Sequence, residues 1–214
     1  MPLTELIDGK SERPAPLRNE PVQARSTARL TALLDAAAGA IDEFGYERLT
    51  TAMVAERAGA SIGTVYRYFP DRIAVLQALA SRNLERVLTG FRSACADRRH
   101  AGWREAVNEC FDVYIAAFRS EPGFASLRGG DVLDLRPPLT DTTVNSQLAK
   151  VMVSALAVRF ETDAAAATEF AFDKAVEIMD AFIARAFARN RSGDPAFLDS
   201  GRELVLSILS DRLG

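Results

Sequence analysis

Histidine and cysteine are almost absent from this 214-residue chain, which contains one histidine, His100, and two cysteines, Cys95 and Cys110. Two cysteines could form one disulfide, but no other feature indicates an oxidising compartment, so we expect two reduced thiols on helices. The three side chains are too few and too poorly spaced for a zinc site. We therefore expect neither a bound metal nor a cofactor.

The chain also lacks the motifs that many enzymes carry. It contains no GxSxG nucleophile elbow, no phosphate-binding P-loop, no GxGxxG and no HExxH. Two acidic pairs at i,i+4 spacing, Glu105 with Glu109 and Asp173 with Glu177, could suggest a metal site, but solvated helix faces explain them more simply. We expect no enzymatic activity.

Long apolar runs are missing as well. No stretch reaches the roughly 18 uncharged apolar residues needed to cross a bilayer. The first residues, MPLTELIDGKSERPAP, lack the basic start and apolar core of a secretory signal. We expect a cytoplasmic protein that does not bind membranes.

Positive charge is not in excess in either part of the chain. The 26 lysines and arginines are outnumbered by 29 aspartates and glutamates, which gives a net charge of −3. Residues 1–72 hold nine basic and ten acidic residues, and residues 73–214 hold 17 and 19. A surface that binds nucleic acid would therefore have to be a local patch of arginines.

The pattern of apolar residues predicts an all-α protein, because helical periodicity recurs and alternating, strand-like runs are absent. Residues 1–21 contain four prolines and are predicted to form a flexible tail. We expect about nine helices in total, with loops at 121–124 and 128–132. The periodic segments are 30–44, 50–59, 61–69, 71–95, 103–119, 140–160, 162–190 and 195–213.

Residues 49–72 predict two short helices joined by a tight turn. Thr50 and Ser61 are placed to cap these helices with their hydroxyls, as Asp71 is for the next helix. Gly59 lies at the turn, where a positive φ is acceptable only for residues such as glycine. This pattern is typical of a helix-turn-helix, whose second helix enters the major groove of DNA.

The second helix of this pair would bury Val65 and Phe69 and turn its other side chains outward. Gly63 would let the backbone approach the duplex, and Ile62 and Thr64 could meet thymine methyl groups. Hydroxyls, arginines and helix starts would contact phosphates. The predicted DNA-binding residues are Thr50, Thr51, Ser61, Ile62, Gly63, Thr64, Tyr66, Arg67, Tyr68 and Arg72.

The segment AGASIGTVYRYFPDR resembles the signature of the tetracycline repressor (TetR) family of bacterial regulators, and the similarity extends over residues 28–76. The chain departs from the family pattern at Met53, Ile62 and Arg72. The resemblance implies three DNA-binding helices followed by a helical domain for ligand binding and dimerisation. We accordingly divide the chain into a tail (1–21), a DNA-binding domain (22–72) and an effector-binding and dimerisation domain (73–214).

The resemblance further implies a ligand-responsive transcription regulator, usually a repressor. It would bind a palindromic double-stranded DNA operator as a homodimer, and a small hydrophobic or aromatic effector would release it. Apolar residues of the second domain could line the effector pocket, although core packing explains each of them as well. The pocket candidates are Phe91, Trp103, Val107, Asn108, Phe111, Tyr114, Phe118, Phe124, Met152, Phe172 and Asp173.

The last two predicted helices, 164–189 and 195–213, carry apolar residues on more than one side, so more than one side needs burial. A four-helix bundle formed by two copies would satisfy this requirement, and so would a core within one chain. The candidate dimer residues are Phe170, Ile178, Met179, Phe182, Leu204, Val205, Ile208 and Leu209.

Two questions stay open at this point. A helical small-molecule carrier, or an interaction protein without functional DNA binding, would show the same periodicity. A salt-dependent gel shift would distinguish these alternatives from a regulator. Arg13 and Arg18 in the tail could reach DNA or remain solvated.

Overall fold

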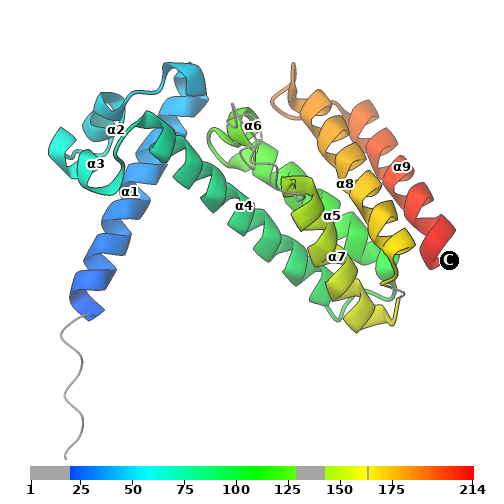
Figure 1. Cartoon of the computed structure of the whole chain (residues 1–214). Coiled ribbons are helices and arrows are strands. Elements are labelled where there is room, and N and C mark those ends of the chain that lie inside the picture. The colour runs from blue at the N-terminus through cyan, green and yellow to red at the C-terminus, as the bar shows by residue number, and fades with distance from the viewer. Residues whose placement is uncertain (1–19, 129–142, 163) are drawn as a thin grey trace, which may run out of the picture.

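The computed structural model describes residues 20–128, 143–162 and 164–214, and every regular element in these ranges is helical (Figure 1). The predicted all-α class is therefore confirmed. None of the described helices is both long and apolar enough to cross a membrane. The elements are α1 (Glu20–Phe44), the 3₁₀ helix η1 (Tyr46–Arg48), α2 (Thr51–Arg57), α3 (Ile62–Tyr68), α4 (Arg72–Ala96), α5 (Trp103–Ser120), α6 (Phe124–Leu127), α7 (Val144–Phe160), α8 (Ala166–Phe187) and α9 (Pro195–Leu213).

Polar side chains begin three helices at the positions that the sequence predicts. The hydroxyls of Thr50 and Ser61 accept hydrogen bonds from the amide three residues further on, at 3.2 and 3.1 Å. The Asp71 carboxylate accepts the equivalent bond at 2.8 Å. Each cap satisfies an amide that the first turn of a helix leaves without a partner. The predicted starts of α2, α3 and α4 are confirmed.

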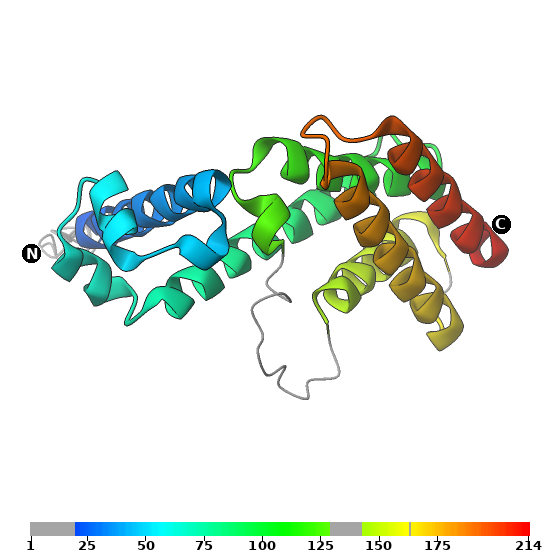
Figure 2. The same ribbon diagram turned by 90° about the horizontal axis from the view of Figure 1, so that it is seen from above.

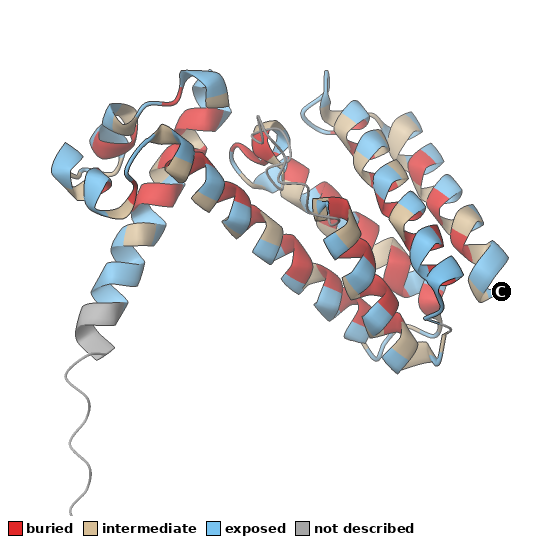
Figure 3. Ribbon diagram, viewed as in Figure 1, coloured by how far each residue is buried: buried red, intermediate tan, exposed pale blue. Residues whose placement is uncertain are grey.

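The first helices enclose a small N-terminal core. Leu33 of α1, Val54 of α2, Val65 and Phe69 at α3, and Leu76 of α4 are between 0% and 4% exposed. The predicted inward position of Val65 and Phe69 is confirmed. Because this side of α3 is buried against α1 and α4, its opposite side faces solvent (Figure 3).

A larger C-terminal core lies among α4, α5, α7, α8 and α9, and aromatic side chains fill much of it. Phe91 and Phe111 are at most 1% exposed. The Phe118 ring lies 5.5 Å from the Tyr114 ring and 5.3 Å from the Phe124 ring, in edge-to-face contacts. Such contacts add to the free energy gained by burying the rings.

The 25-residue helix α4 belongs to both cores. Leu79 packs in the N-terminal core and Val87 in the C-terminal core, so the two clusters separate within the helix. The cores therefore part beyond residues 72 and 73, where the sequence placed the domain boundary. Figures 1 and 2 show α4 running from α1–α3 at one end of the molecule toward α5 and α7.

Two segments differ from the sequence-based expectation. Helix α1 begins at Glu20, inside the predicted tail, since Pro21 in a first helical turn lacks only an amide that has no partner there. The loop expected at 121–124 leads into the one-turn helix α6. Gly123 has φ +72° before this turn, and burial of Leu127 holds it in place.

The two cysteines meet between α4 and α5 in the C-terminal core. Cys95 and Cys110 are free thiols, both fully buried, with their Sγ atoms 3.6 Å apart. The neighbouring Cys95 thiol and burial raise the pKa of Cys110 well above its ordinary value, because the thiolate would be poorly solvated there. We therefore assign the pair a packing role and low nucleophilicity.

Candidate functional site

The turn between α2 and α3 is built around Gly59, which has φ +57°. Its amide donates to the Glu56 carbonyl at 3.1 Å, and the Ala60 amide donates to the Ala55 carbonyl at 2.9 Å. These two bonds form a Schellman motif, which ends α2 and directs the chain into α3. The predicted positive φ at Gly59 is confirmed.

Replacing Gly59 with alanine is expected to lower the free energy of unfolding by about 1 kcal/mol, because a Cβ disfavours the left-handed region. Nothing lies within 4 Å of the position that a Cβ would take, so backbone conformation is the cause. Chemical denaturation measures the change. Gly63→Ala is the control, since Gly63 has no positive φ. Equal losses in both variants would contradict this explanation.

The side of α3 that faces solvent presents most of the residues predicted to read DNA. Ile62 is 43% exposed and Tyr66 is 53% exposed. Gly63 and Arg67 are also exposed, and Thr64 is half-buried. The seven residues of α3 make about two turns, a length that fits within the major groove.

The two tyrosines of α3 already contact neighbouring helices. The Tyr68 hydroxyl lies 3.2 Å from the Ser26 hydroxyl of α1. The Thr51 hydroxyl donates to the Tyr66 hydroxyl at 3.4 Å. A phenol can donate and accept at once, so these contacts orient both groups without using all of their hydrogen-bonding capacity.

Three further predicted DNA-binding residues have structural contacts. Arg72 donates to the Glu47 carbonyl at 2.6 Å, which joins the start of α4 to η1. Thr50 and Ser61 are helix caps, and the Ser61 hydroxyl also lies 2.9 Å from the Thr64 hydroxyl. Contacts of these three residues with DNA stay predictions. The tail arginines considered above lie outside the described residues.

A groove of about 720 Å³ between α1 and α3 contains arginines that the sequence analysis did not identify. Its walls include Arg25 and Arg29 of α1, one turn apart, and Arg67 of α3, and none of its lining residues is acidic. We call it the arginine groove. It is the kind of local patch that the near-neutral charge of the chain requires of a nucleic-acid-binding surface. The i,i+4 spacing in α1 was a visible signal, but only the fold brings it next to α3.

Nothing inside the protein requires a glycine at position 63. Gly63 has no positive φ, and a Cβ there would meet only the Ser61 hydroxyl, at 3.9 Å. That distance is ordinary van der Waals contact. The missing side chain therefore has its main effect outside the protein, where it lets another molecule approach the α3 backbone.

A cavity of about 270 Å³ lies among α4, α5 and α6. Of the predicted pocket residues, only Phe124 lines it. Asn83, which is 2% exposed, and Arg86, which pairs with Glu121, bring polar groups to largely apolar walls. The lining residues are Asn83, Arg86, Val87, Val113, Ala116, Ala117, Ser120, Glu121 and Phe124.

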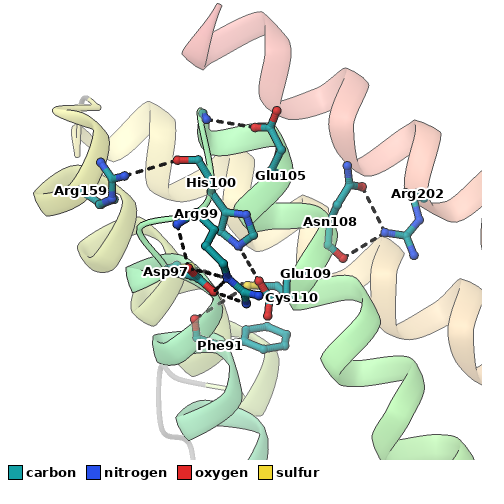
Figure 4. Close-up of polar contacts among 12 residues, drawn as sticks. Phe91, Asp97, Arg99, His100, Glu105, Asn108, Glu109, Cys110, Arg159 and Arg202 are labelled. Carbon is teal, nitrogen blue, oxygen red and sulfur yellow. Dashed lines mark hydrogen bonds and ion pairs between the residues drawn. The ribbon is translucent and has the colours of Figure 1, made fainter.

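The other predicted pocket residues lie elsewhere, which moves the candidate effector site to the α4–α5–α6 cavity. Asn108 accepts two hydrogen bonds from Arg202 of α9, at 3.0 and 3.1 Å (Figure 4), and Asp173 is half-buried on α8. Large apolar side chains pack the core because they fill space, and a cavity forms where such side chains are missing. The predicted pocket residues that are buried in the core are Phe91, Trp103, Val107, Phe111, Tyr114, Phe118, Met152 and Phe172.

A polar network joins the wall of this cavity to α8. Asp180 of α8 accepts a hydrogen bond from the Tyr114 hydroxyl at 2.9 Å and forms an ion pair with Arg128 at 2.7 Å. The Arg128 carbonyl in turn accepts a hydrogen bond from Asn83 of α4 at 3.5 Å. The network therefore connects α4, α5 and α8 through the residue that follows α6.

The predicted dimer residues fall into two groups. Phe170 is 63% exposed and Leu204 is 44% exposed. Ile178, Phe182 and Ile208 are half-buried. The second group is buried inside the protomer and cannot reach a partner, which corrects that part of the prediction: Met179, Val205 and Leu209.

Two segments of the chain match known protein families. Residues 101–213, more than half of the chain, match the family described as tetracyclin repressor-like, C-terminal domain. Residues 33–79 match the family described as bacterial regulatory proteins, tetR family. The second match contains α2, α3 and the turn between them.

Individual relatives match over shorter lengths. A 91-residue segment is 33% identical to the nucleoid occlusion factor SlmA of Actinobacillus pleuropneumoniae, over 42% of this chain and 44% of SlmA. A 55-residue segment is 40% identical to the HTH-type transcriptional repressor KstR of Rhodococcus jostii, over 26% of each protein. The matched segments span less than half the length of these curated relatives.

Solved structures match over most of the chain. A TetR-family transcriptional regulator from Streptomyces coelicolor is 32% identical, with a TM-score of 0.72 over 86% of this chain and 99% of that chain. The repressor AlkX from Dietzia is 20% identical, with a TM-score of 0.58 over 86% of this chain and 97% of that chain. The second likeness concerns the fold alone. The shared fold therefore extends well beyond the helix-turn-helix.

Proposed function

The chain belongs to the tetracycline repressor (TetR) family of bacterial regulatory proteins, and from this premise we propose that it is a ligand-responsive repressor. The resemblance found in the sequence is thereby confirmed at the level of the family, whose members are transcriptional regulators. In this proposal residues 22–72 bind a palindromic operator, residues 73–214 bind the effector and form the homodimer, and the protein has no catalytic activity.

The solvent-facing side of α3 is the observation that carries the proposal for DNA. Ile62 and Gly63 give it a smooth apolar surface that fits base edges and thymine methyl groups. The arginine groove lies beside it, and Arg25, Arg29 and Arg67 would bind phosphates. Base contacts then supply specificity, while the arginines supply most of the affinity.

The effector would bind in the cavity among α4, α5 and α6. Its volume of about 270 Å³ lies near the lower end of ligand pockets, roughly 300–1,000 Å³, so the effector is small. Val87, Val113 and Phe124 would bury its apolar part. Asn83 and Arg86 would bind a polar or anionic group at one end.

Helix α6 offers a route from this cavity to the DNA-binding helices. Phe124 lines the cavity, whereas Leu127 packs in the N-terminal core. A Cβ on Gly123 would lie 3.0 Å from both the Ala38 carbonyl oxygen and Ile41 of α1, so the two helices are in close contact. An effector that displaces Phe124 would shift α6 against α1 and favour a conformation that does not fit DNA.

Helices α8 and α9 would form the dimer surface. They lie at the opposite end of the molecule from α3 (Figures 1 and 2). Pairing of two copies would bury Phe170 and Leu204, which are exposed in one protomer, together with parts of Ile178, Phe182 and Ile208. The two-fold axis of the dimer would match that of the operator.

Gly63→Ala tests the DNA-reading surface. We expect it to weaken binding to DNA from upstream of its own gene by about tenfold or more, because a good base contact is worth roughly 1–3 kcal/mol and the new methyl group holds α3 away from the bases. Folding should not suffer, since alanine is a better helix former than glycine. Fluorescence anisotropy measures the affinity, and denaturation measures the stability.

Gly39→Ala is the matched control for this experiment. It adds a methyl group to α1 in the same domain, where a Cβ would meet only the end of the flexible Arg57 side chain, at 3.3 Å. Operator affinity should stay unchanged. Unaltered binding by Gly63→Ala, or equal losses in both variants, would contradict the proposed reading surface.

A further inference from the structure

Three side chains of metal-binding type meet where α4 ends and α5 begins. Asp97 follows the last residue of α4, His100 lies in the next turn, and Glu109 lies on α5. Their potential ligand atoms all lie within 4.8 Å of one another. The His100 Nε2 atom is 2.5 Å from a Glu109 carboxylate oxygen, and Figure 4 shows the three side chains gathered together.

The backbone fixes this arrangement. The Asp97 carboxylate accepts a hydrogen bond from the Arg99 amide at 2.8 Å, and the His100 amide donates to the Asp97 carbonyl at 3.3 Å. The His100 carbonyl in turn accepts a hydrogen bond from Arg159 of α7, at 3.3 Å. Glu109 is held by helix α5. Because the three side chains are held close together before any ligand arrives, a ligand would have little ordering to impose.

The cluster attracts positive charge. Its two carboxylates lie beside one imidazole, and the side chains of Asp97 and His100 are only 20% and 14% exposed. Hydrogen bonds from the Arg99 guanidinium lower the pKa of Asp97 to about 2, so this carboxylate is ionised at neutral pH. Arg99 is itself 82% exposed, so it can leave Asp97 at little cost.

We propose that Asp97, His100 and Glu109 bind one divalent transition-metal ion of the first row, such as zinc. Zinc binds imidazole nitrogen and carboxylate oxygen at about 2.0–2.2 Å, so its ligands lie about 3–4 Å apart and the cluster needs to close only slightly. The imidazole favours such an ion over magnesium or calcium, which take oxygen ligands. Arg99 gives up Asp97 when the ion binds, and water completes the coordination.

The position of the site gives the ion a structural consequence. It lies at the C-terminal end of α4, where the helix dipole also favours a cation. An ion held by Asp97 and Glu109 joins the end of α4 to α5, at the other end of α4 from the DNA-binding helices (Figure 1). Because the three ligands meet only in the folded chain, the ion stabilises that chain against unfolding.

The single histidine makes a direct test possible. In the tag-free chain, every imidazole signal of a ¹H–¹⁵N spectrum comes from His100. Titration with zinc chloride is expected to shift the Nε2 signal and to saturate at one equivalent. Zinc on the thiols of Cys95 and Cys110 would not bind this nitrogen. An unchanged imidazole signal, or an equal response to calcium chloride, would overturn the proposal.

Four variants sharpen this test. Asp97→Asn and Glu109→Gln keep the side-chain shape and should weaken zinc binding by more than about tenfold, since even an outer-shell partner of a metal ligand is worth that much. Arg99→Ala should bind zinc more tightly, because it frees the Asp97 carboxylate. Glu85→Gln changes an exposed carboxylate of α4 and should bind zinc as the unmodified chain does. Calorimetry measures the affinities, and circular dichroism checks the fold. Unchanged binding in both isosteric variants would overturn the proposal.

Discussion

Replacing Arg25, Arg29 and Arg67 together with alanine is expected to weaken operator binding on the order of a hundredfold near physiological salt. These side chains line the arginine groove beside α3, where no lining residue is acidic. Each phosphate contact releases condensed counterions and contributes about 0.9 to the slope of log affinity against log salt concentration. The slope should therefore fall by about 0.9 for each arginine removed per protomer, on all DNA sequences alike.

Anisotropy titrations between about 50 and 200 mM salt would measure this slope. The matched control replaces Arg92, Arg189 and Arg212 with alanine. These exposed arginines of the C-terminal part remove the same charge without touching the groove. A similar loss of slope in the control would mean that overall charge, and not the arginine groove, governs affinity.

The helix-turn-helix could be predicted because its signals are local in the sequence. Thr50 and Ser61 each bond to an amide three residues away, and Gly59 takes a positive φ at a turn that ends a helix. Val65 and Phe69 share one side of a helix because they are four residues apart. None of these features depends on distant parts of the chain.

The arginine groove and the effector cavity could not be predicted in this way, because both form between helices. Arg25 and Arg67 are far apart in sequence and share a groove only after α1 and α3 have packed. The cavity has alanines such as Ala117 in its walls, which give no distinct pattern. Aromatic periodicity instead identified well-packed places such as Phe91 and Phe111.

The two C-terminal helices show a related limit. Apolar residues on several sides indicate that more than one side is covered, but not which side the same chain covers. Helix α9 packs so closely on α8 that a Cβ on Gly201 would lie 2.7 Å from the Phe182 Cβ. Met179, Val205 and Leu209 are therefore buried by their own protomer, and only the outward residues stay available for a partner.

The metal-type cluster was missed for the same reason. The sequence analysis weighed Cys95, His100 and Cys110 as a ligand set and found their spacing unsuitable. The fold instead places the cysteines in the core and turns His100 toward Glu109, with Asp97 nearby. Nothing in the sequence distinguishes Glu109 from other acidic residues of an exposed helix face, because the turn between α4 and α5 decides which of them His100 meets.

Asp180→Ala is expected to lower the free energy of unfolding by about 2–3 kcal/mol. Breaking a buried ion pair from one side typically costs 3–5 kcal/mol, and the partial exposure of Arg128 reduces this figure. The side chains of Asp180 and Arg128 are 15% and 33% exposed. The substitution would leave the Arg128 charge without its partner and take away the acceptor of the 2.9 Å hydrogen bond from Tyr114. Urea denaturation followed by circular dichroism measures the loss.

Glu85→Ala is the matched control for this prediction. Glu85 forms an ion pair with Arg92 at 3.4 Å on the surface of α4, with side chains 69% and 52% exposed, so its loss should cost at most about 1 kcal/mol. A smaller loss in Asp180→Ala combined with Arg128→Met than in Asp180→Ala alone would show that the unpaired charge carries most of the cost. Equal stabilities of Asp180→Ala and Glu85→Ala would mean that the network from the cavity wall to α8 does not stabilise the fold. In that case, coupling between effector and dimer surface would have to run through α4 and α6 alone.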